Sequence, residues 1–104
     1  MDLKFDLHNA KYDAHKKLVR FVAMDGTLRI KCVVTLDALA RAEGEPVPDR
    51  KSPALYKKHA ETMHHIVVRK YRANEFDSLH RIAISASDID INKWRSADVE
   101  SEAA

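Results

Sequence analysis

Residues 18–35 read LVRFVAMDGTLRIKCVVT, and this stretch decides the fold. The central Asp25-Gly26 pair is the strongest short-range signal for a β-hairpin, because a type I′ turn needs positive φ at both of its central residues. A two-residue turn at that pair places Met24 opposite Thr27. Every second residue along the two strands is then apolar or small, which predicts one buried face and a defined register. The pairs predicted on the buried face are Ala23 with Leu28, Phe21 with Ile30, and Val19 with Cys32.

The opposite face of this hairpin carries cationic and apolar side chains together. Arg20, Arg29 and Lys31 project from it, and the predicted register places Arg20 directly opposite Lys31. Like charges in that arrangement are mildly destabilising. Two interpretations stay open, because the long side chains could extend into water or could form a face that binds anions. The apolar residues on or beside this face are Leu18, Val22, Met24 and Val33.

Two helices are expected after the hairpin. Thr35 is a suitable N-cap for a short helix that Gly44 can end, and a proline-containing loop follows at residues 44–52. Ser52, with proline after it, then suits the start of one long helix over residues 53–72. The apolar residues of that helix follow helical spacing and form a single stripe of Leu55, Tyr56, Ala60, Met63, Ile66, Val67 and Tyr71.

A further strand is expected over residues 80–85. Ile82 and Ile84 alternate there with Arg81, so the isoleucines face one way and Arg81 the other. If this strand pairs in phase with the hairpin, Arg81 joins the cationic face. Residues 3–5 are a candidate for another short strand. The predicted fold class is α+β, with an antiparallel sheet of three to four strands and one short and one long helix packed on one face. The expected order is β-β-β-α-α-β, in two layers.

The composition is that of a small globular protein. The chain has 104 residues, of which 45% are hydrophobic and 33% charged, with a formal net charge of +2. We expect residues 1–95 to form a single domain and residues 96–104 to form a mobile acidic tail. The sequence shows no signal-peptide pattern and no apolar run long enough to span a bilayer, so we expect a cytoplasmic protein without membrane contact. The single cysteine, Cys32, excludes an intramolecular disulfide.

No residue pattern predicts catalysis, a cofactor or a metal site. Six histidines are present, but His59 and His64 are five residues apart, which separates them by about 140° around a helix axis. Neither that pair nor the adjacent His64 and His65 makes the i,i+4 arrangement of a zinc-binding helix. Cys32 points into the predicted core, where a thiol is unreactive. The sequence also lacks a glycine-rich phosphate loop, and it therefore favours a protein that is not an enzyme.

Several short motifs, in their order along the chain, resemble a known family. They are Leu3-x-Phe5, Tyr12-Asp13, Val19-Arg20-Phe21-x-Ala23-x-Asp25-Gly26 and Cys32-x-Val34-Thr35-x-Asp37-Ala38-Leu39. Over roughly residues 3–90 the chain resembles the small bacterial proteins catalogued as domain of unknown function 1488. The resemblance implies a compact α+β fold, and it implies no catalytic or binding residue because the family has none assigned. The loop at 44–52 is longer and richer in proline than the resemblance leads us to expect.

Two hypotheses for function follow. The first is a small non-catalytic interaction or regulatory module that uses a protein partner or a homodimer, based on the apolar residues of the outer hairpin face. The alternative is weak binding of nucleic acid through its phosphate backbone. Base stacking on the sheet is disfavoured, because Phe21 is predicted to face inward. The candidate anion or nucleic-acid residues are Arg20, Arg29, Lys31 and Arg81 on the sheet, and Lys58, Arg69 and Arg72 on the outer side of the long helix.

Overall fold

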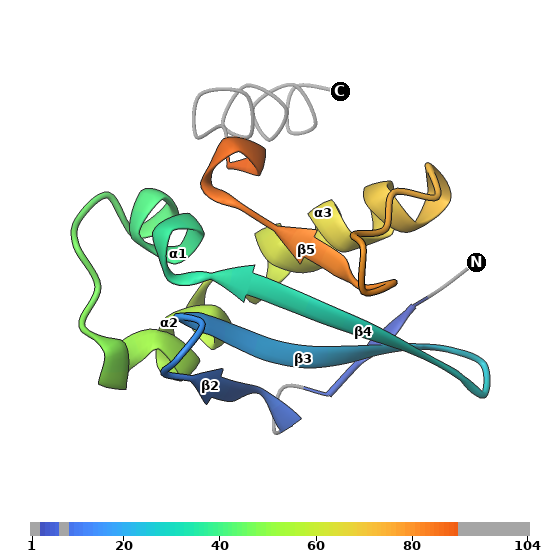
Figure 1. Ribbon diagram of the computed structural model, residues 1–104, viewed down its shortest axis with the longest axis horizontal. Helices are drawn as coiled ribbons and strands as arrows, with labels where there is room; N and C mark the ends of the chain where they lie inside the picture. The colour runs from blue at the N-terminus through green and yellow to red at the C-terminus, as the bar shows by residue number, and fades with distance from the viewer. Residues whose placement is uncertain (1–2, 7–8, 90–104) are drawn as a thin grey trace, which may run out of the picture.

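The computed structural model describes residues 3–6 and 9–89, so the predicted acidic tail lies outside the described residues. Within them the chain forms one five-stranded sheet and three α-helices. The strands are β1 (Lys4–Phe5), β2 (Lys11–Asp13), β3 (Leu18–Asp25), β4 (Leu28–Thr35) and β5 (Ile82–Ile84). The helices are α1 (Leu36–Glu43), α2 (Ser52–Lys58) and α3 (Ala60–Arg72), with one-turn 3-10 helices at Asp49–Lys51 and Ala86–Asp88. Figure 1 shows the long β3–β4 hairpin crossing the molecule, with α1 beside the end at which β4 leads into it.

The predicted α+β class is confirmed, and the sheet is mostly antiparallel. β3 pairs antiparallel with β4 along one edge, and with β1 and β2 along the other. β5 is the exception, because it pairs with β4 in parallel. Three helices lie between β4 and β5 in the chain, and a crossover through helices is the connection that parallel strands need. The short strand expected at residues 3–5 is present as β1, whereas the sequence did not indicate β2.

The hairpin forms as predicted, but its register is shifted by two residues. In the turn, Gly26 has positive φ (+62°), whereas Asp25 does not have the positive φ that a turn at Asp25-Gly26 would require. The observed two-residue turn is Gly26-Thr27, and within it only the glycine adopts the left-handed conformation, which costs glycine little. Because the shift is even, every residue keeps its predicted face. Ile30 takes the place opposite Ala23 that was predicted for Leu28, and Leu28 is exposed at the hairpin tip instead of buried. The observed pairs include Val19 with Val34, Phe21 with Cys32, Ala23 with Ile30 and Asp25 with Leu28.

Gly26 is expected to tolerate substitution poorly. No atom lies within 4 Å of the place where its β-carbon would stand, so the energetic penalty of a side chain arises in the backbone. Gly26→Ala should lower the free energy of unfolding by about 1–2 kcal/mol in urea denaturation, because alanine disfavours positive φ. Gly26→Asn is the control and should lose less, since asparagine enters this region more readily. Equal losses for the two variants would contradict a conformational origin.

The ends of α1 form as predicted, whereas the start of α2 does not. Thr35 Oγ1 accepts the backbone N–H of Ala38 at 3.1 Å, and Gly44 ends the helix with a φ of +84°. Ser52 lies inside α2 instead of capping it, and its hydroxyl donates to the carbonyl oxygen of Asp49 at 2.6 Å. The 3-10 turn before Ser52 thus begins the helical path earlier than the Ser-Pro signal indicated.

The single long helix expected over residues 53–72 is instead two helices. α2 ends at Lys58 and α3 begins at Ala60, with His59 between them at φ −103° and ψ 19°. α2 packs against α1 and β3, whereas α3 packs against β5. One straight helix could not follow both surfaces. His59 Nε2 also lies 3.2 Å from Glu43 Oε1 on α1, which ties the corner between α2 and α3 to the rest of the helical layer.

The core lies between the helices and one face of the sheet, which we call the inner face. The other face, which we call the outer face, is not covered by these helices. Two polar contacts attach α3 to the sheet: Tyr71 Oη donates to Asp25 Oδ2 at 2.7 Å, and Lys70 Nζ donates to the Ala83 carbonyl oxygen at 3.0 Å. The buried cluster contains Val19, Phe21, Ala23, Ile30, Cys32, Val34, Ala38, Leu39, Tyr56, Met63, Ile66, Val67, Ile82, Ile84 and Ile89.

Candidate functional site

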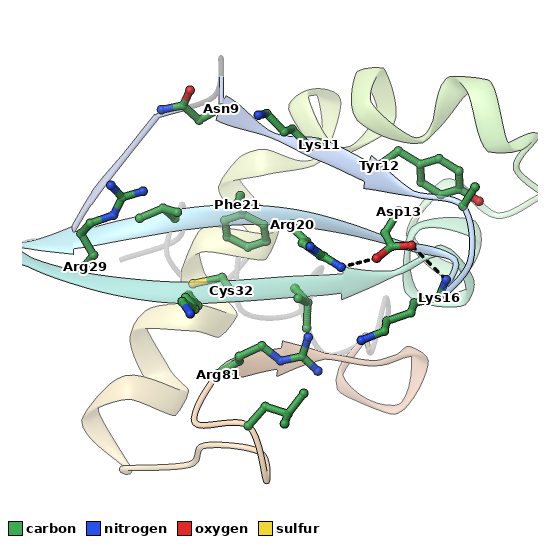
Figure 2. A pocket seen from close by; sticks show the side chains of 15 residues that line it. Asn9, Lys11, Tyr12, Asp13, Lys16, Arg20, Phe21, Arg29, Cys32 and Arg81 are labelled. Carbon is green, nitrogen blue, oxygen red and sulfur yellow. Dashed lines mark hydrogen bonds and ion pairs between the residues drawn. The ribbon is translucent and has the colours of Figure 1, made fainter.

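The outer face of the sheet is hollowed by a cavity of about 960 Å³. Its floor is formed by β3 and β4, one side by Asn9 and β2, and the other side by Leu79 and Arg81 just before β5. Figure 2 looks into this cavity with the strands in front of the helices. We call it the basic hollow, because its lining includes six cationic side chains, those of Lys11, Lys16, Arg20, Arg29, Lys31 and Arg81.

The basic hollow contains far more positive than negative charge. Among its described lining residues, Asp13 is the only acidic one. The full chain carries a formal net charge of only +2, from 18 Lys and Arg against 16 Asp and Glu. The fold therefore gathers a local excess of cations that the overall charge does not reveal.

Strand alternation and register bring the predicted sheet residues together. The observed register places Arg20 opposite Val33, so the like-charge pair predicted between Arg20 and Lys31 does not form. On the other side of β4, the parallel pairing of Val33 with Ala83 places Arg81 beside Lys31 on the same face. All of the sheet residues named from the sequence, Arg20, Arg29, Lys31 and Arg81, line the basic hollow.

Asp13 holds Arg20 in place at one side of the hollow. Its Oδ1 accepts the backbone N–H groups of His15 and Lys16 at 3.0 and 3.2 Å, and its Oδ2 accepts a hydrogen bond from Arg20 Nη2. The Lys16 N–H and the Arg20 guanidinium together hold the pKa of the Asp13 carboxyl below its usual range, although desolvation opposes them. Asp13 is therefore ionised at neutral pH and fixes one end of the Arg20 side chain.

Asp77 holds Arg81 by the same arrangement at the opposite side. Its Oδ1 accepts the backbone N–H groups of Leu79 and Arg81 at 2.9 and 2.8 Å, and its Oδ2 accepts Arg81 Nε at 3.0 Å. The Arg81 N–H, followed by the Arg81 guanidinium, holds the pKa of Asp77 below its usual range against desolvation. In both cases one carboxylate oxygen closes a turn of the backbone and the other contacts an arginine.

The remaining strand cations of the hollow are held differently. Lys11, Arg29 and Lys31 are exposed, and none of them forms an ion pair with an acidic residue in the described part of the chain. Their charges are therefore available to an incoming anion, but their side chains are not held in one position. The hollow thus contains two arginines that form ion pairs with aspartates, surrounded by lysine and arginine side chains that form none in the described part of the chain.

The helix residues named from the sequence do not belong to this surface. Lys58 Nζ pairs with Glu43 Oε1 at 2.8 Å. Arg69 and Arg72 line a second, smaller hollow of about 760 Å³ on α3, together with His64, His65 and Glu61. Because α3 packs on the inner face, this second hollow lies on the opposite side of the protein. The sheet residues and the helix residues named from the sequence therefore lie on two separate surfaces.

Sequence reasoning missed Lys11 and Lys16, which also line the basic hollow. Lys11 lies on β2, a three-residue strand that is too short to show clear alternation, and Lys16 lies in the turn that joins β2 to β3. One local signal was available: an aspartate at the start of a turn commonly accepts backbone N–H groups two and three residues later. Asp13 does so here, and its position would have indicated a turn between two strands.

The apolar patch expected on the outer face is not present as predicted. Leu18 is 7% exposed and Val33 3% exposed, while Val22 and Met24 are half-buried. Val33 faces outward, so its burial reflects cover from the long side chains around it. The large hydrophobic residues that are exposed in the described part of the chain are Leu28, at the hairpin tip, and Leu79, at the edge of the hollow.

The described residues also bear on two other kinds of site, a reactive cysteine and a metal centre. Burial raises the pKa of the Cys32 thiol to about 12, so the predicted inward orientation keeps it protonated. No three His, Cys, Asp or Glu side chains in the described ranges come together as metal ligands would. Within residues 3–6 and 9–89, no helix is both long and apolar enough to cross a membrane.

Comparison with known proteins gives two matches. Residues 3–84 match the family model described as "Protein of unknown function (DUF1488)". Among solved structures, the chain is similar to a DUF1488-family protein of unknown function from Shewanella loihica PV-4, with a TM-score of 0.73 and 15% sequence identity. The alignment covers 81% of this chain and 94% of that one, and at this identity it shows a shared fold. No curated protein matches the chain.

Proposed function

This chain belongs to the DUF1488 family of proteins of unknown function, and we propose that its outer sheet face binds the phosphate backbone of nucleic acid without reading the bases. The observation that carries the proposal is the basic hollow, in which six cationic side chains and one carboxylate surround a single concavity. Concave surfaces lined by one sign of charge focus the electrostatic potential and attract ligands of the opposite sign. A chain of phosphates is an extended ligand that can contact several of these cations at once.

The side chains of the hollow suit phosphate rather than bases. Arginine and lysine donate hydrogen bonds to phosphate oxygens, and these contacts position a protein on nucleic acid without carrying sequence information. Sheet proteins that read single-stranded RNA stack bases on exposed aromatic residues. Here Phe21 is 2% exposed, and Tyr12 is paired with Val19 of the inner face. The expected mode of binding is therefore weak, sequence-independent and sensitive to salt.

The competing hypothesis of a protein partner or homodimer has less support. It was based on an apolar set on the outer face, and two members of that set, Leu18 and Val33, are buried. An acidic peptide could still bind a cationic hollow through charge alone. A test of the proposal must therefore separate phosphate from carboxylate ligands.

A polarisation titration against salt tests the proposed function. Labelled single-stranded and duplex oligonucleotides of mixed sequence would be titrated with the protein between about 50 and 200 mM salt, where phosphate contacts weaken strongly. If each of the six cations contacts a phosphate, the plot of log affinity against log salt for the duplex should have a slope of about −5, and fewer contacts give a shallower slope. Absence of binding at the lowest salt would overturn the proposal, and so would equal affinity for a polyglutamate peptide of matched charge.

A pair of matched variants locates the binding surface. The double variant R29Q/K31Q removes two positive charges from the hollow and should reduce the steepness of the salt dependence by about two, one for each phosphate contact. The control R69Q/R72Q removes the same charge from α3 on the opposite side of the protein and should leave the slope unchanged. Equal changes for the two variants would contradict the outer face as the site.

A further inference from the structure

We infer that Arg20 and Arg81, each held by an aspartate, together bind one backbone phosphate in the basic hollow through directional guanidinium contacts, while the other cations contribute through their charge. This inference rests on the proposed function and names the residues that make the discrete contact. It begins from position. Arg20 lies opposite Val33 on β4, and Arg81 lies beside Lys31 on the other edge of the same strand. Figure 2 shows Arg20 and Arg81 on either side of β4 within the hollow.

The surroundings of Val33 support a shared location for the two arginines. Val33 faces away from the helices, yet it is 3% exposed. Its immediate neighbours across the sheet on this face are Arg20 on β3 and Ala83 on β5. Ala83 is too small to cover it, so longer side chains that line the hollow supply the cover, as the aliphatic stems of arginine and lysine commonly do. Both Arg20 and Arg81 line the concavity that lies over this part of the sheet.

The two aspartates make these arginines different from the other cations. Arg20 contacts Asp13 through Nη2, and Arg81 contacts Asp77 through Nε. A guanidinium group has five N–H donors in a rigid plane, so each arginine keeps donors free for a ligand after this contact. Because its position is already restricted, it loses less conformational entropy when it binds. The side-chain exposure of 55% for Arg20 and 19% for Arg81 leaves both guanidinium groups within reach of the hollow.

A phosphate is the ligand that fits this arrangement. Guanidinium groups bind phosphate oxygens through paired, directional hydrogen bonds, whereas a lysine ammonium acts as a compact point charge. The contribution of Arg20 and Arg81 should therefore depend on the guanidinium group itself. The contribution of Arg29, whose side chain is exposed and unpaired in the described part of the chain, should depend only on its charge.

Charge-preserving variants test this distinction. The double variant R20K/R81K should weaken binding of the duplex about tenfold at fixed salt, and the salt slope should be nearly unchanged because the charge is kept. R29K is the matched control and should change affinity less than about twofold. If R20K/R81K behaves like R29K while the wild-type protein still binds, the inference fails and the proposed function stands. If the wild-type protein does not bind at all, the proposed function itself fails.

Variants of the two aspartates provide a second test. Restraint of the arginines by the aspartates and attraction by charge alone predict opposite changes in affinity. D13N and D77N retain an Oδ1 that can accept the backbone N–H groups, but they replace the oxygen that contacts the arginine. Each variant also removes a negative charge, so attraction by charge alone would tighten binding. We expect the double variant D13N/D77N to bind about threefold or more weakly, because the arginines lose their restraint. Tighter binding would overturn the inference.

Two controls accompany the aspartate variants. E43Q removes one negative charge from α1, where Glu43 pairs with Lys58 outside the hollow, and it should leave affinity unchanged or slightly increased. Thermal unfolding of each variant checks that the fold is intact. Should D13N/D77N fail to fold, R20K/R81K alone decides the inference, since it leaves both aspartates in place.

Discussion

Replacing Phe21 with alanine is expected to lower the free energy of unfolding by about 3–5 kcal/mol, the usual range for removing a buried aromatic ring. Phe21 is 2% exposed and lies at the centre of the inner face. Its ring centroid is 4.5 Å from that of Tyr56 on α2 and 6.3 Å from that of Phe5 on β1. The ring therefore joins the sheet, the edge strand and the helical layer, and alanine would leave a cavity between all three.

Urea denaturation followed by circular dichroism measures this loss. Domains of this size are stable by about 5–15 kcal/mol, so the variant should be close to unfolding at 37 °C if the protein lies at the lower end. Leu28→Ala is the control, because Leu28 is 57% exposed at the hairpin tip and its removal should change stability by less than about 0.5 kcal/mol. A loss below about 1 kcal/mol for Phe21→Ala would contradict the packing described for the core.

Acidification from about pH 7 to about pH 4 is expected to destabilise the protein through His64. Burial lowers the pKa of this histidine from 6.5 to about 4. Its ring stacks on Phe5, with centroids 3.7 Å apart, and its Nε2 lies 2.7 Å from the hydroxyl of Tyr56. A neutral imidazole can accept the tyrosine proton at Nε2, whereas a protonated one cannot. The folded state therefore holds the neutral form over a pH range in which the unfolded chain takes up a proton.

The sign of this effect follows from proton uptake. Above about pH 6.5 both states carry a neutral His64, and the stabilisation is fully present. Between about pH 6.5 and pH 4 the unfolded state binds an additional proton, so the free energy of unfolding falls as pH falls. Each unit of pKa difference corresponds to about 1.4 kcal/mol. Because the ring is half-buried and water screens part of the effect, we expect a loss of about 2 kcal/mol across this range.

The variant His64→Gln isolates this contribution, because glutamine does not titrate and can still accept the Tyr56 proton. The wild-type free energy of unfolding should fall toward pH 4 by about 2 kcal/mol more than that of His64→Gln. The carboxyls whose pKa values are lowered, those of Asp13, Glu43, Asp77 and Asp88, are common to both proteins, so the comparison between them cancels that part of the acid destabilisation. Parallel pH profiles for the wild type and His64→Gln would contradict the assignment.

Four of the residues that line the basic hollow could be named from the sequence, because strand alternation alone assigns a face. Once residues 18–35 are recognised as a hairpin, Arg20, Arg29 and Lys31 lie on the side opposite Phe21, whatever the exact pairing. The two-residue shift in register did not alter this result, since an even shift preserves the face. The same alternation places Arg81 on the side opposite Ile82 and Ile84, and the parallel pairing of β5 with β4 then brings it beside Lys31.

Other parts of the site depended on contacts between segments that are far apart in the chain. Lys11 enters the hollow because β2 pairs with β3, and β2 is too short for its own alternation to be informative. Asp77 matters because it closes a turn and contacts Arg81 at the same time. Lys58, Arg69 and Arg72 lie outside the hollow, because the helices that carry them cover the inner face of the sheet.

The sequence by itself determined the hairpin, the capped short helix, the inward strand residues other than Leu28, and the cationic outer face of the hairpin, since all of these follow from local periodicity and turn chemistry. Only the tertiary structure decided the register, the break at His59 and the burial of Val33. For each of these features, the alternative arrangements are nearly equal in energy as far as local sequence is concerned, and contacts with distant segments select one of them. The observed turn lies one residue later than the predicted one, so that in the turn only Gly26 has positive φ, and the new register buries Val34. Two helices form in place of the predicted single helix because α2 and α3 pack against different strands.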